Sequence, residues 1–191
     1  MPQRRIGAST SETRTSLLNA AEDLMREQGY AAVSSRALAA KAGLKPQLVH
    51  YYFRTMDDLF LALWHRRADS LYKRQDDILK ATKPLKALWD LTSDPHDVVL
   101  SYEFVALANH RKNIRAEIAE FGDRYRDRQM KILTKLLNKK RDALGGWPVM
   151  ISVMVLDSLA RVLAVEGALG MKVGHAKARG AVGRLIKQLE R

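Results

Sequence analysis

The sequence predicts an all-α protein of about nine helices, and three observations lead to this fold class. Apolar residues recur at helical spacing along most of the 191 residues, and no run alternates apolar and polar residues for long enough to predict a strand. Capping and stopping residues divide the chain into segments of helical length. The composition, with 47% hydrophobic and 28% charged residues, is that of a folded globular protein.

The first helix is predicted to follow a polar arm at residues 1–10. Ser9 and Glu12 have the spacing of a capping box, in which each side chain satisfies an amide at the start of a helix. Gly29 is a typical C-terminal stop. Between them, four apolar residues share one helical face: Leu17, Ala21, Leu24 and Met25.

Two short helices are predicted next, at about 34–42 and 45–53. Ser34 is a suitable N-cap for the first, and Gly43 ends it. The second begins near Lys45 with Pro46 in its first turn, where a missing amide proton costs nothing. We therefore expect a pair of helices joined by a tight turn.

A long helix is predicted from the cap-like pair Thr55 and Asp58 to about Lys80. Breaks at prolines and glycines then define five further helices, at 84–92, 95–110, 114–144, 148–170 and 174–190.

The segment 149–171 is largely apolar and is predicted to be a buried helix rather than a membrane span. It holds Asp157, Arg161 and Glu166. Each would cost roughly 2.5–3.5 kcal/mol near the centre of a bilayer. We therefore expect no membrane partner.

The pair of short helices has the form of a helix-turn-helix, whose second helix lies in the major groove of DNA. Such a unit needs an apolar interior, for which we expect Leu38, Ala42, Leu44, Val49 and Phe53. The second helix retains a set of donors, flat rings and one apolar side chain: Lys45, Gln47, Leu48, His50, Tyr51 and Tyr52. A net charge of +12 favours a polyanionic partner but equally fits a well-solvated surface.

Several short motifs span residues 13–59: Thr13-Arg14, Leu17-Leu18-Asn19-Ala20-Ala21, Gly29-Tyr30, Ala39, Ala42-Gly43-Leu44, Tyr52-Phe53 and Asp57-Asp58-Leu59. Together they resemble the N-terminal domain of the TetR family of bacterial regulators. The resemblance implies a DNA-binding domain at 1–54 and an effector-binding and dimerisation domain at 55–191. It also implies a homodimer that binds a palindromic double-stranded operator, usually as a repressor, and releases it when a small molecule binds.

Three residues depart from the pattern of the family. His50 stands where a tyrosine is usual, and Leu48 stands where a small or hydroxyl residue is common. Met56 stands where the family usually has a lysine that binds the DNA backbone, so we expect no phosphate contact from it.

Phosphate contacts are expected at the start of the first short helix and on the second. Ser34 and Arg36 lie at a helix N-terminus, whose dipole favours an anion. Tyr51 and Tyr52 are expected to hydrogen-bond phosphates, although Tyr52 can instead pack into the small core. His50 is a further candidate, as a cation.

Base contacts are expected from Lys45 with guanine and from Gln47 with adenine. Leu48 is a candidate for a thymine methyl contact, or is simply an exposed leucine. Arg4 and Arg5 of the arm either enter the minor groove or are disordered in the free protein.

Aromatic residues concentrate between 64 and 125, where an effector pocket is expected. The candidates are Trp64, Trp89, Tyr102, Phe104, Phe121 and Tyr125, and the alternative for each ring is an ordinary core position. Polar groups for the pocket are expected among Glu103, Asn109 and His110.

The last two helices are expected to form the dimer interface. The helix at 148–170 is apolar nearly all round and needs cover on two sides. The last helix has apolar residues at helical spacing, namely Ala178, Ala181, Val182, Leu185 and Leu189. The two can pair with their symmetry mates in a self-complementary four-helix bundle.

Segment 111–141 holds eleven basic residues against four acidic ones. It is either a second polyanion-binding surface or, as we favour, the solvated face of a long helix.

Other classes of protein are disfavoured by what the sequence lacks. There is no cysteine, so disulfides, zinc–cysteine sites and thiol catalysis are excluded. The five histidines are scattered, and no phosphate-binding glycine loop or nucleophile elbow is present. We therefore expect no enzyme, no metal and no cofactor. The N-terminus begins Met1-Pro2-Gln3-Arg4-Arg5 without the apolar stretch of a secretory signal, so a cytoplasmic location is expected. The alternatives that stay open are an activator or a DNA-binding protein without an effector.

Overall fold

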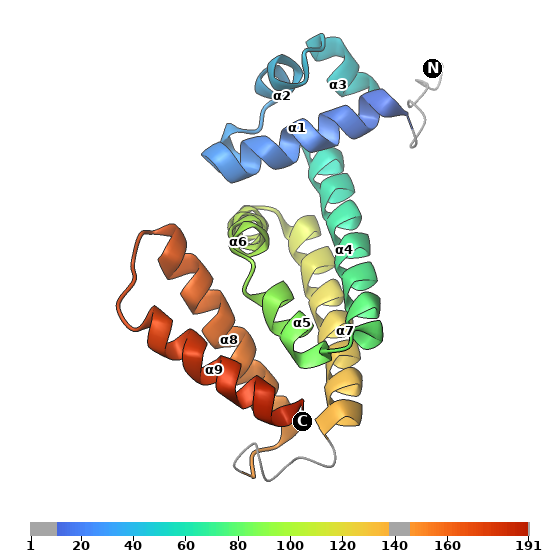
Figure 1. Cartoon of the computed structure of the whole chain (residues 1–191). Helices are drawn as coiled ribbons and strands as arrows, with labels where there is room; N and C mark the ends of the chain where they lie inside the picture. The colour runs from blue at the N-terminus through green and yellow to red at the C-terminus, as the bar shows by residue number, and fades with distance from the viewer. Residues whose placement is uncertain (1–10, 138–145, 191) are drawn as a thin grey trace. The chain divides into compact units, whose positions relative to one another are not determined.

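The computed structural model describes residues 11–137 and 146–190 of the chain. Within them lie nine α-helices, one short 3-10 helix and no strand, which confirms the all-α class. The elements are α1 (Glu12–Gln28), η1 (Tyr30–Ala32), α2 (Ser35–Ala42), α3 (Pro46–Tyr52), α4 (Met56–Lys80), α5 (Pro84–Thr92), α6 (Pro95–His110), α7 (Lys112–Leu137), α8 (Val149–Ala168) and α9 (His175–Leu189) (Figure 1).

The chain folds into two compact units. The first comprises the chain up to Asp69 together with Leu100–Ile118, and the second comprises Ser70–Val99 together with the chain from Ala119 onward. Helices α4, α6 and α7 contribute residues to both units.

Helix α1 begins slightly later than predicted. The expected cap, Ser9, lies outside the described residues. The N-cap is Ser11, whose side chain accepts a hydrogen bond from the Arg14 amide at 3.1 Å. Glu12 is therefore the first helical residue and not the third, as a capping box requires.

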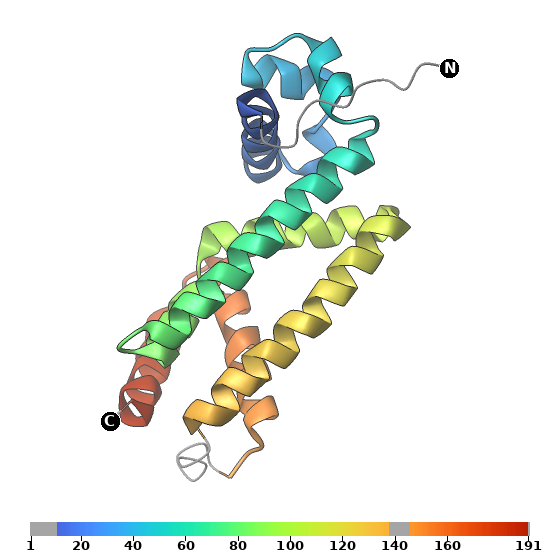
Figure 2. The same cartoon turned by 90° about the vertical axis from the view of Figure 1, so that its right-hand side faces the viewer.

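In the first unit, α2 lies against α1, and α3 lies against α2 (Figures 1 and 2). The capping box predicted for α4 is present: the Thr55 amide donates to the Asp58 carboxylate at 3.0 Å, and the Asp58 amide donates to the Thr55 hydroxyl at 3.1 Å. Both side chains thereby satisfy amides that a helix start leaves without partners.

Helix α7, unlike α1, begins earlier than predicted, at Lys112. Only Arg111 separates it from α6, and the Arg111 carbonyl accepts a hydrogen bond from the Arg115 amide at 3.0 Å. The predicted end of this helix, at 138–144, lies outside the described residues.

In the second unit, α8 and α9 form an antiparallel hairpin (Figure 1). Their inner faces pack with α5 and the end of α7 in one apolar cluster, which contains Leu85, Leu133, Leu137, Val149, Val153, Val182, Ile186 and Leu189. Glu190 caps α5, because its carboxylate accepts hydrogen bonds from the amides of Leu85 and Lys86 at 2.8 and 3.0 Å. In residues 11–137 and 146–190, no helix combines the length and apolarity needed to cross a membrane.

Candidate nucleic-acid interface and ligand cavity

The helix-turn-helix has the apolar interior that the sequence predicts, with one difference. Leu38, Val49 and Phe53 are at most 3% exposed and share the core with buried residues of α1. Ala42 and Leu44 are only half-buried. Three of the five expected side chains, together with Ala39, therefore form the buried interior of the motif.

The turn between α2 and α3 depends on Gly43. Its backbone is left-handed, at φ +66°, where a glycine avoids the steric cost of a side chain. The Gly43 amide donates to Ala40 at 3.2 Å, and the Leu44 amide donates to Ala39 at 2.8 Å. This pattern of two bonds satisfies the last carbonyls of α2 and turns the chain directly into α3.

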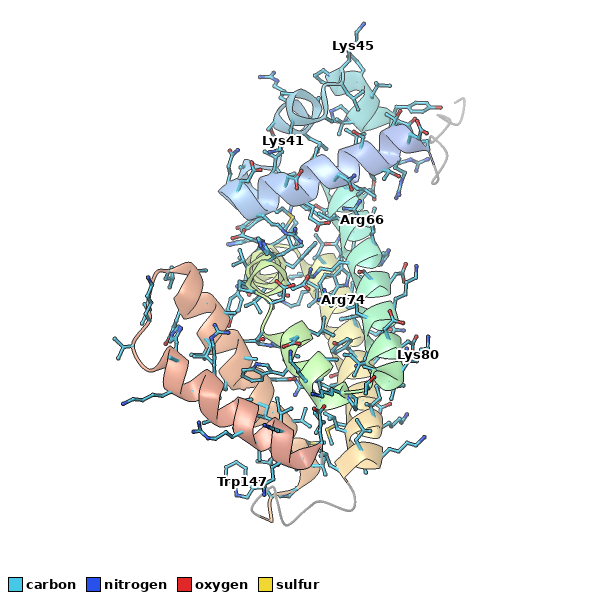
Figure 3. The ribbon with its side chains drawn as sticks, in the orientation of Figure 1. Lys41, Lys45, Arg66, Arg74, Lys80 and Trp147 are labelled. Carbon is cyan, nitrogen blue, oxygen red and sulfur yellow. The ribbon has the colours of Figure 1, made fainter. Side chains whose placement is uncertain are left out.

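The outer face of the motif carries the side chains predicted to contact DNA. Six of them are exposed, namely Ser34, Arg36, Lys45, Gln47, His50 and Tyr51, while Leu48 and Tyr52 are half-buried. Figure 3 shows Lys45 extending from the start of α3, away from α1. All eight side chains are thus at least partly exposed, on α2, on α3 or at the residues that cap them.

Three of these side chains are held in place by local contacts. The Ser34 hydroxyl accepts a hydrogen bond from the Ala37 amide at 3.2 Å, so its own proton can still be donated. The rings of Tyr51 and Tyr52 meet edge to face, with centroids 5.1 Å apart. The predicted minor-groove residues Arg4 and Arg5 lie outside the described residues.

Ion pairs and hydrogen bonds join the helices of the first unit. Lys41 at the end of α2 pairs with Glu27 of α1 at 2.6 Å. Arg66 of α4 donates to the Leu18 carbonyl at 3.1 Å and to the side chains of Asn19 and Glu22, each at 2.7 Å (Figure 3). A guanidinium has five donors in a rigid fork, so one side chain can hold three groups of α1.

The start of α4 carries a contact that the sequence alone did not identify. Asp57 pairs with Arg111 and accepts a hydrogen bond from Asn113 at 3.2 Å. The Arg111 guanidinium also lies over the Phe60 ring, 5.5 Å from its centroid. Met56, which replaces the lysine usual in the family, is half-buried.

Glu103 joins α6 to the end of α1. Its carboxylate accepts a hydrogen bond from the Tyr30 amide at 2.7 Å, and a side chain at Gly29 would place its Cβ 3.3 Å from the same oxygen. The Tyr30 ring stacks with His110 at 6.3 Å between centroids. Glu103 and His110, expected to line a ligand pocket, thus support the DNA-binding helices, and Asn109 is exposed.

The second unit contains a cavity of about 40 Å³ between α5, α7, α8 and α9. Most of its wall is apolar. The lining residues are Leu85, Leu88, Trp89, Thr92, Leu133, Leu137, Ser152, Val153, Leu156, Asp157, Ile186 and Leu189.

Of the six aromatic residues expected to bind an effector, Trp89 lines this cavity. Phe104 and Trp64 pack against each other in the core of the first unit, with centroids 5.0 Å apart. Tyr102 is 49% exposed. Phe121 and Tyr125 stack at 5.4 Å in the second unit, where Tyr72 joins them.

Asp157, which lines the cavity, belongs to a group of buried polar residues in the second unit. Asp157 is 7% exposed, and burial raises the pKa of its carboxyl above the usual value of 3.8. Gln129 donates to Asp157 at 3.2 Å, and Gln75 donates to the Tyr125 carbonyl at 3.3 Å. Burial, with the nearby charge of Asp157, raises the pKa of Tyr125 to about 12.

The exposed residues of α8 are mostly apolar, with Ser158 and Arg161 among them. Met150, Ile151, Met154, Val155 and Val162 are each about half exposed, at 45–50%. On α9, by contrast, Val182 and Leu189 of the expected dimer set are buried within the chain, Ala178 and Leu185 are half-buried, and Ala181 is exposed.

Many of the basic side chains at 111–141 are paired with carboxylates. Arg124 pairs with Glu120 at 3.1 Å, Lys131 pairs with Asp127 at 2.7 Å, and Arg128 pairs with Asp76. The first two pairs join residues at i and i+4 and are typical of a solvated helix surface, whereas the third joins α7 to α4. Lys139, Lys140 and Arg141 lie outside the described residues.

Comparison with known proteins agrees with this architecture. Residues 17–63 match the family model of bacterial regulatory proteins of the TetR family. No curated protein sequence matches the chain.

Three solved structures are similar over nearly the whole chain. A protein of Rhodococcus sp. described as a TetR-family transcriptional regulator is 15% identical, with a TM-score of 0.70 over 95% of this chain and 100% of that one. A transcriptional regulator of Saccharomonospora viridis in complex with choline is 20% identical, with a TM-score of 0.77 over 93% and 97% of the two chains. Bacillus subtilis FadR in complex with stearoyl-CoA is 16% identical, with a TM-score of 0.63 over 92% and 96%.

At these identities the three structures are evidence of a shared fold, while the match at 17–63 covers the helix-turn-helix itself. Residues 17–63 therefore form a DNA-binding domain of the TetR type, and the chain as a whole has the fold of these solved regulators.

Proposed function

We propose that this protein is a transcriptional repressor that binds a palindromic operator as a homodimer and releases it when a small molecule occupies the cavity of the second unit. In this proposal residues 1–54 bind DNA, and residues 55–191 bind the effector and dimerise. The observation that carries the proposal is the exposed polar face of α3. The opposite face of α3 is buried and apolar, and the helix follows directly after the turn at Gly43.

Lys45 and Gln47 are proposed to read bases, because both are exposed near the N-terminus of α3. In a helix-turn-helix the first residues of the second helix are those that reach the base edges. Leu48 is half-buried and offers only part of its side chain to a thymine methyl. The specificity of the protein should therefore depend mainly on two side chains.

Phosphate contacts are proposed for Ser34, Arg36, His50, Tyr51 and Tyr52. The hydroxyl of Ser34 has a proton to donate, and the positive N-terminal dipole of α2 favours a phosphate there. Phosphate contacts fix the register of a protein on DNA and carry no base information. Loss of any one of these side chains should therefore weaken binding to all sequences alike.

Dimerisation is proposed through α8, with α9 at its side. A row of half-exposed methionine, isoleucine and valine side chains on a soluble protein is typical of an interface. A two-fold axis at this row would let each copy cover the other. The exposed residues of α9, such as Ala181, Arg184 and Gln188, suit the edge of that interface rather than its centre.

Effector binding is proposed for the cavity in the second unit. Mostly apolar walls with a few polar groups are the usual lining of a small-molecule site. Two structural neighbours were solved with ligands as different as choline and stearoyl-CoA, which supports a small-molecule effector here without naming it.

Selection of operators from random duplexes by the full chain tests the proposal. We expect a palindrome whose half-sites lie one helical turn apart, about 10–10.5 base pairs, or a multiple of it. Light scattering should give a dimer of the 21.6 kDa chain in solution. Equal affinity for all duplexes, or a monomer that binds a single half-site, would contradict the proposal.

A further inference from the structure

The basic side chains of residues 11–69 fall into two groups by their contacts. Five of the eight are engaged with other groups of the chain: Arg14, Arg26, Lys41, Arg66 and Arg67. The other three have no hydrogen bond or ion pair with any residue of 11–137 or 146–190, and these are Arg36, Lys45 and Arg54. A guanidinium or ammonium group that no carboxylate of the chain occupies is suited to an external anion.

All three cations of the second group belong to the helix-turn-helix or to the residues that follow it. Arg36 lies in the first turn of α2, and Lys45 is the N-cap of α3. Arg54 lies between the end of α3 and the start of α4, and its side chain is exposed. The first two already have a proposed contact with DNA, whereas Arg54 has no assigned role.

Hydrogen bonds fix the backbone on both sides of Arg54. The Phe53 amide donates to the Val49 carbonyl at 2.8 Å, at the end of α3. The Thr55 amide donates to the Asp58 carboxylate at 3.0 Å, at the start of α4. The position from which the Arg54 side chain extends is therefore set by two helix ends.

Two aspartates follow Arg54 at the start of α4, and neither pairs with it. Asp57 pairs with Arg111 and accepts a hydrogen bond from Asn113 at 3.2 Å. The Asp58 carboxylate is engaged in the capping box of α4. The acidic groups nearest to Arg54 in the sequence thus have other partners.

Arg54 is also close to side chains proposed to contact phosphates. It follows Tyr51 and Tyr52 by three and two residues. Since consecutive Cα atoms are about 3.8 Å apart, the Cα atoms of Arg54 and Tyr52 are at most about 7.6 Å apart. Base edges are reached from the N-terminal residues of the second helix, and Arg54 lies beyond its C-terminal end. Its position therefore suits the DNA backbone rather than a base.

We propose that Arg54 is a further DNA-binding residue, whose guanidinium binds a backbone phosphate of the operator beside the contacts of Tyr51 and Tyr52. This inference rests on the proposed function, in which α2 and α3 bind the operator. The planar fork of a guanidinium matches two oxygens of a phosphate. In a homodimer each operator receives this contact twice, once from each copy.

The test measures the affinity of the full-length protein for its selected operator and for random duplexes, by fluorescence anisotropy at several salt concentrations. Arg54→Ala removes one charge from each of the two copies. The slope of log affinity against log salt should therefore fall in magnitude by about two, since each phosphate contact contributes about 0.9. Affinity should fall by roughly tenfold for all duplexes alike, because a phosphate contact carries no base information.

Two further variants separate a phosphate contact from a general effect of charge. Arg54→Lys keeps the charge and should retain the salt slope, with a smaller loss of affinity than Arg54→Ala. Lys73→Ala is the matched control, because Lys73 is an exposed cation of α4 in the second unit and has no partner among the described residues. This variant should retain both the affinity and the slope.

Unchanged affinity in Arg54→Ala, a loss confined to one base pair of the operator, or an equal loss in Lys73→Ala would overturn the inference. If Arg54→Ala does not fold, Arg54→Gln gives the same comparison. Selective operator binding that Arg54→Ala leaves intact would refute this contact alone. Absence of a preferred operator for the unmodified protein would refute the proposed function, and with it a role for Arg54 at an operator.

Discussion

The helix-turn-helix and the cavity of the second unit place their polar groups in opposite environments. On α2 and α3 the polar side chains are exposed, and the interior of Leu38, Val49 and Phe53 is wholly apolar. In the cavity the wall is mostly apolar, and the Asp157 carboxylate in it is buried and accepts a hydrogen bond from the buried Gln129.

This difference corresponds to two kinds of ligand. A hydrated surface can exchange water for phosphates and base edges without first burying a charge, which suits a large polyanion. A buried acceptor costs free energy until a donor arrives, and so favours a ligand that fits inside. The predictions below test the two arrangements, from the largest expected effect to the smallest.

Removal of the central leucine of the motif should have the largest effect on stability. Leu38→Ala leaves a cavity at a fully buried position and should lower the free energy of unfolding by about 2–5 kcal/mol. Leu79→Ala, at a position that is 48% exposed, should change it by less than about 0.5 kcal/mol. Urea unfolding followed by circular dichroism measures both, and equal effects would contradict a closed interior.

The exposed face should act on specificity instead of stability. Gln47→Ala should cost about 1–3 kcal/mol of discrimination at one base pair of the operator. Fluorescence anisotropy with the operator and with duplexes changed at each position measures this loss. Gln28→Ala, an exposed glutamine on α1, should bind like the unmodified protein. A uniform loss on every duplex would place Gln47 on a phosphate rather than on a base.

Local signals in the sequence account for the helix-turn-helix. The caps at Ser34 and Thr55 and the stop at Gly43 act over three or four residues, so each can be recognised without knowledge of the rest of the chain. The exposed face of α3 follows from helical periodicity once Val49 and Phe53 are assigned to the core.

Contacts between distant residues could not be predicted in this way. Glu103 and the Tyr30 amide are 73 residues apart, and Arg111 and Asp57 are 54 apart. A carboxylate on a helix has many possible partners, and only the packing of the helices selects one. The sequence therefore placed Glu103 in a pocket, while the structure places it at the end of α1.

The cavity illustrates the same difficulty for apolar residues. An aromatic ring packs equally well in a core or in a ligand site, so sequence alone did not separate Trp89, on the cavity wall, from Trp64, which packs on Phe104. From the sequence, the charge of Asp157 was evidence against a membrane span. Its position in the cavity wall depends on the rotation of α8 about its axis, which the sequence does not specify. Only the arrangement of α5, α7, α8 and α9 determines that position.

Stability should depend on pH through Asp157. Because its pKa is raised in the folded protein, the protonated form favours folding. This contribution is fully present below pH 3.8 and is lost as the pH rises through the folded-state pKa. Asp157→Asn should therefore be more stable than the unmodified protein at neutral pH, by about 1–3 kcal/mol, the usual cost of a buried polar group with incomplete hydrogen bonding. Urea unfolding at several pH values should show the two proteins converging in acid, and a constant difference would contradict the assignment.

The smallest effect is expected where a polar pair is fully hydrated. Lys131 and Asp127 lie 2.7 Å apart on α7, with side chains 76% and 64% exposed. Water already solvates both charges, so Lys131→Ala should lower the free energy of unfolding by no more than about 0.5 kcal/mol. Operator affinity should also be unchanged if the basic segment is a solvated helix surface. A clear loss of affinity for all duplexes would instead make this segment a second DNA-binding surface. Exposed polar side chains would then bind DNA on α7 as well as on α2 and α3.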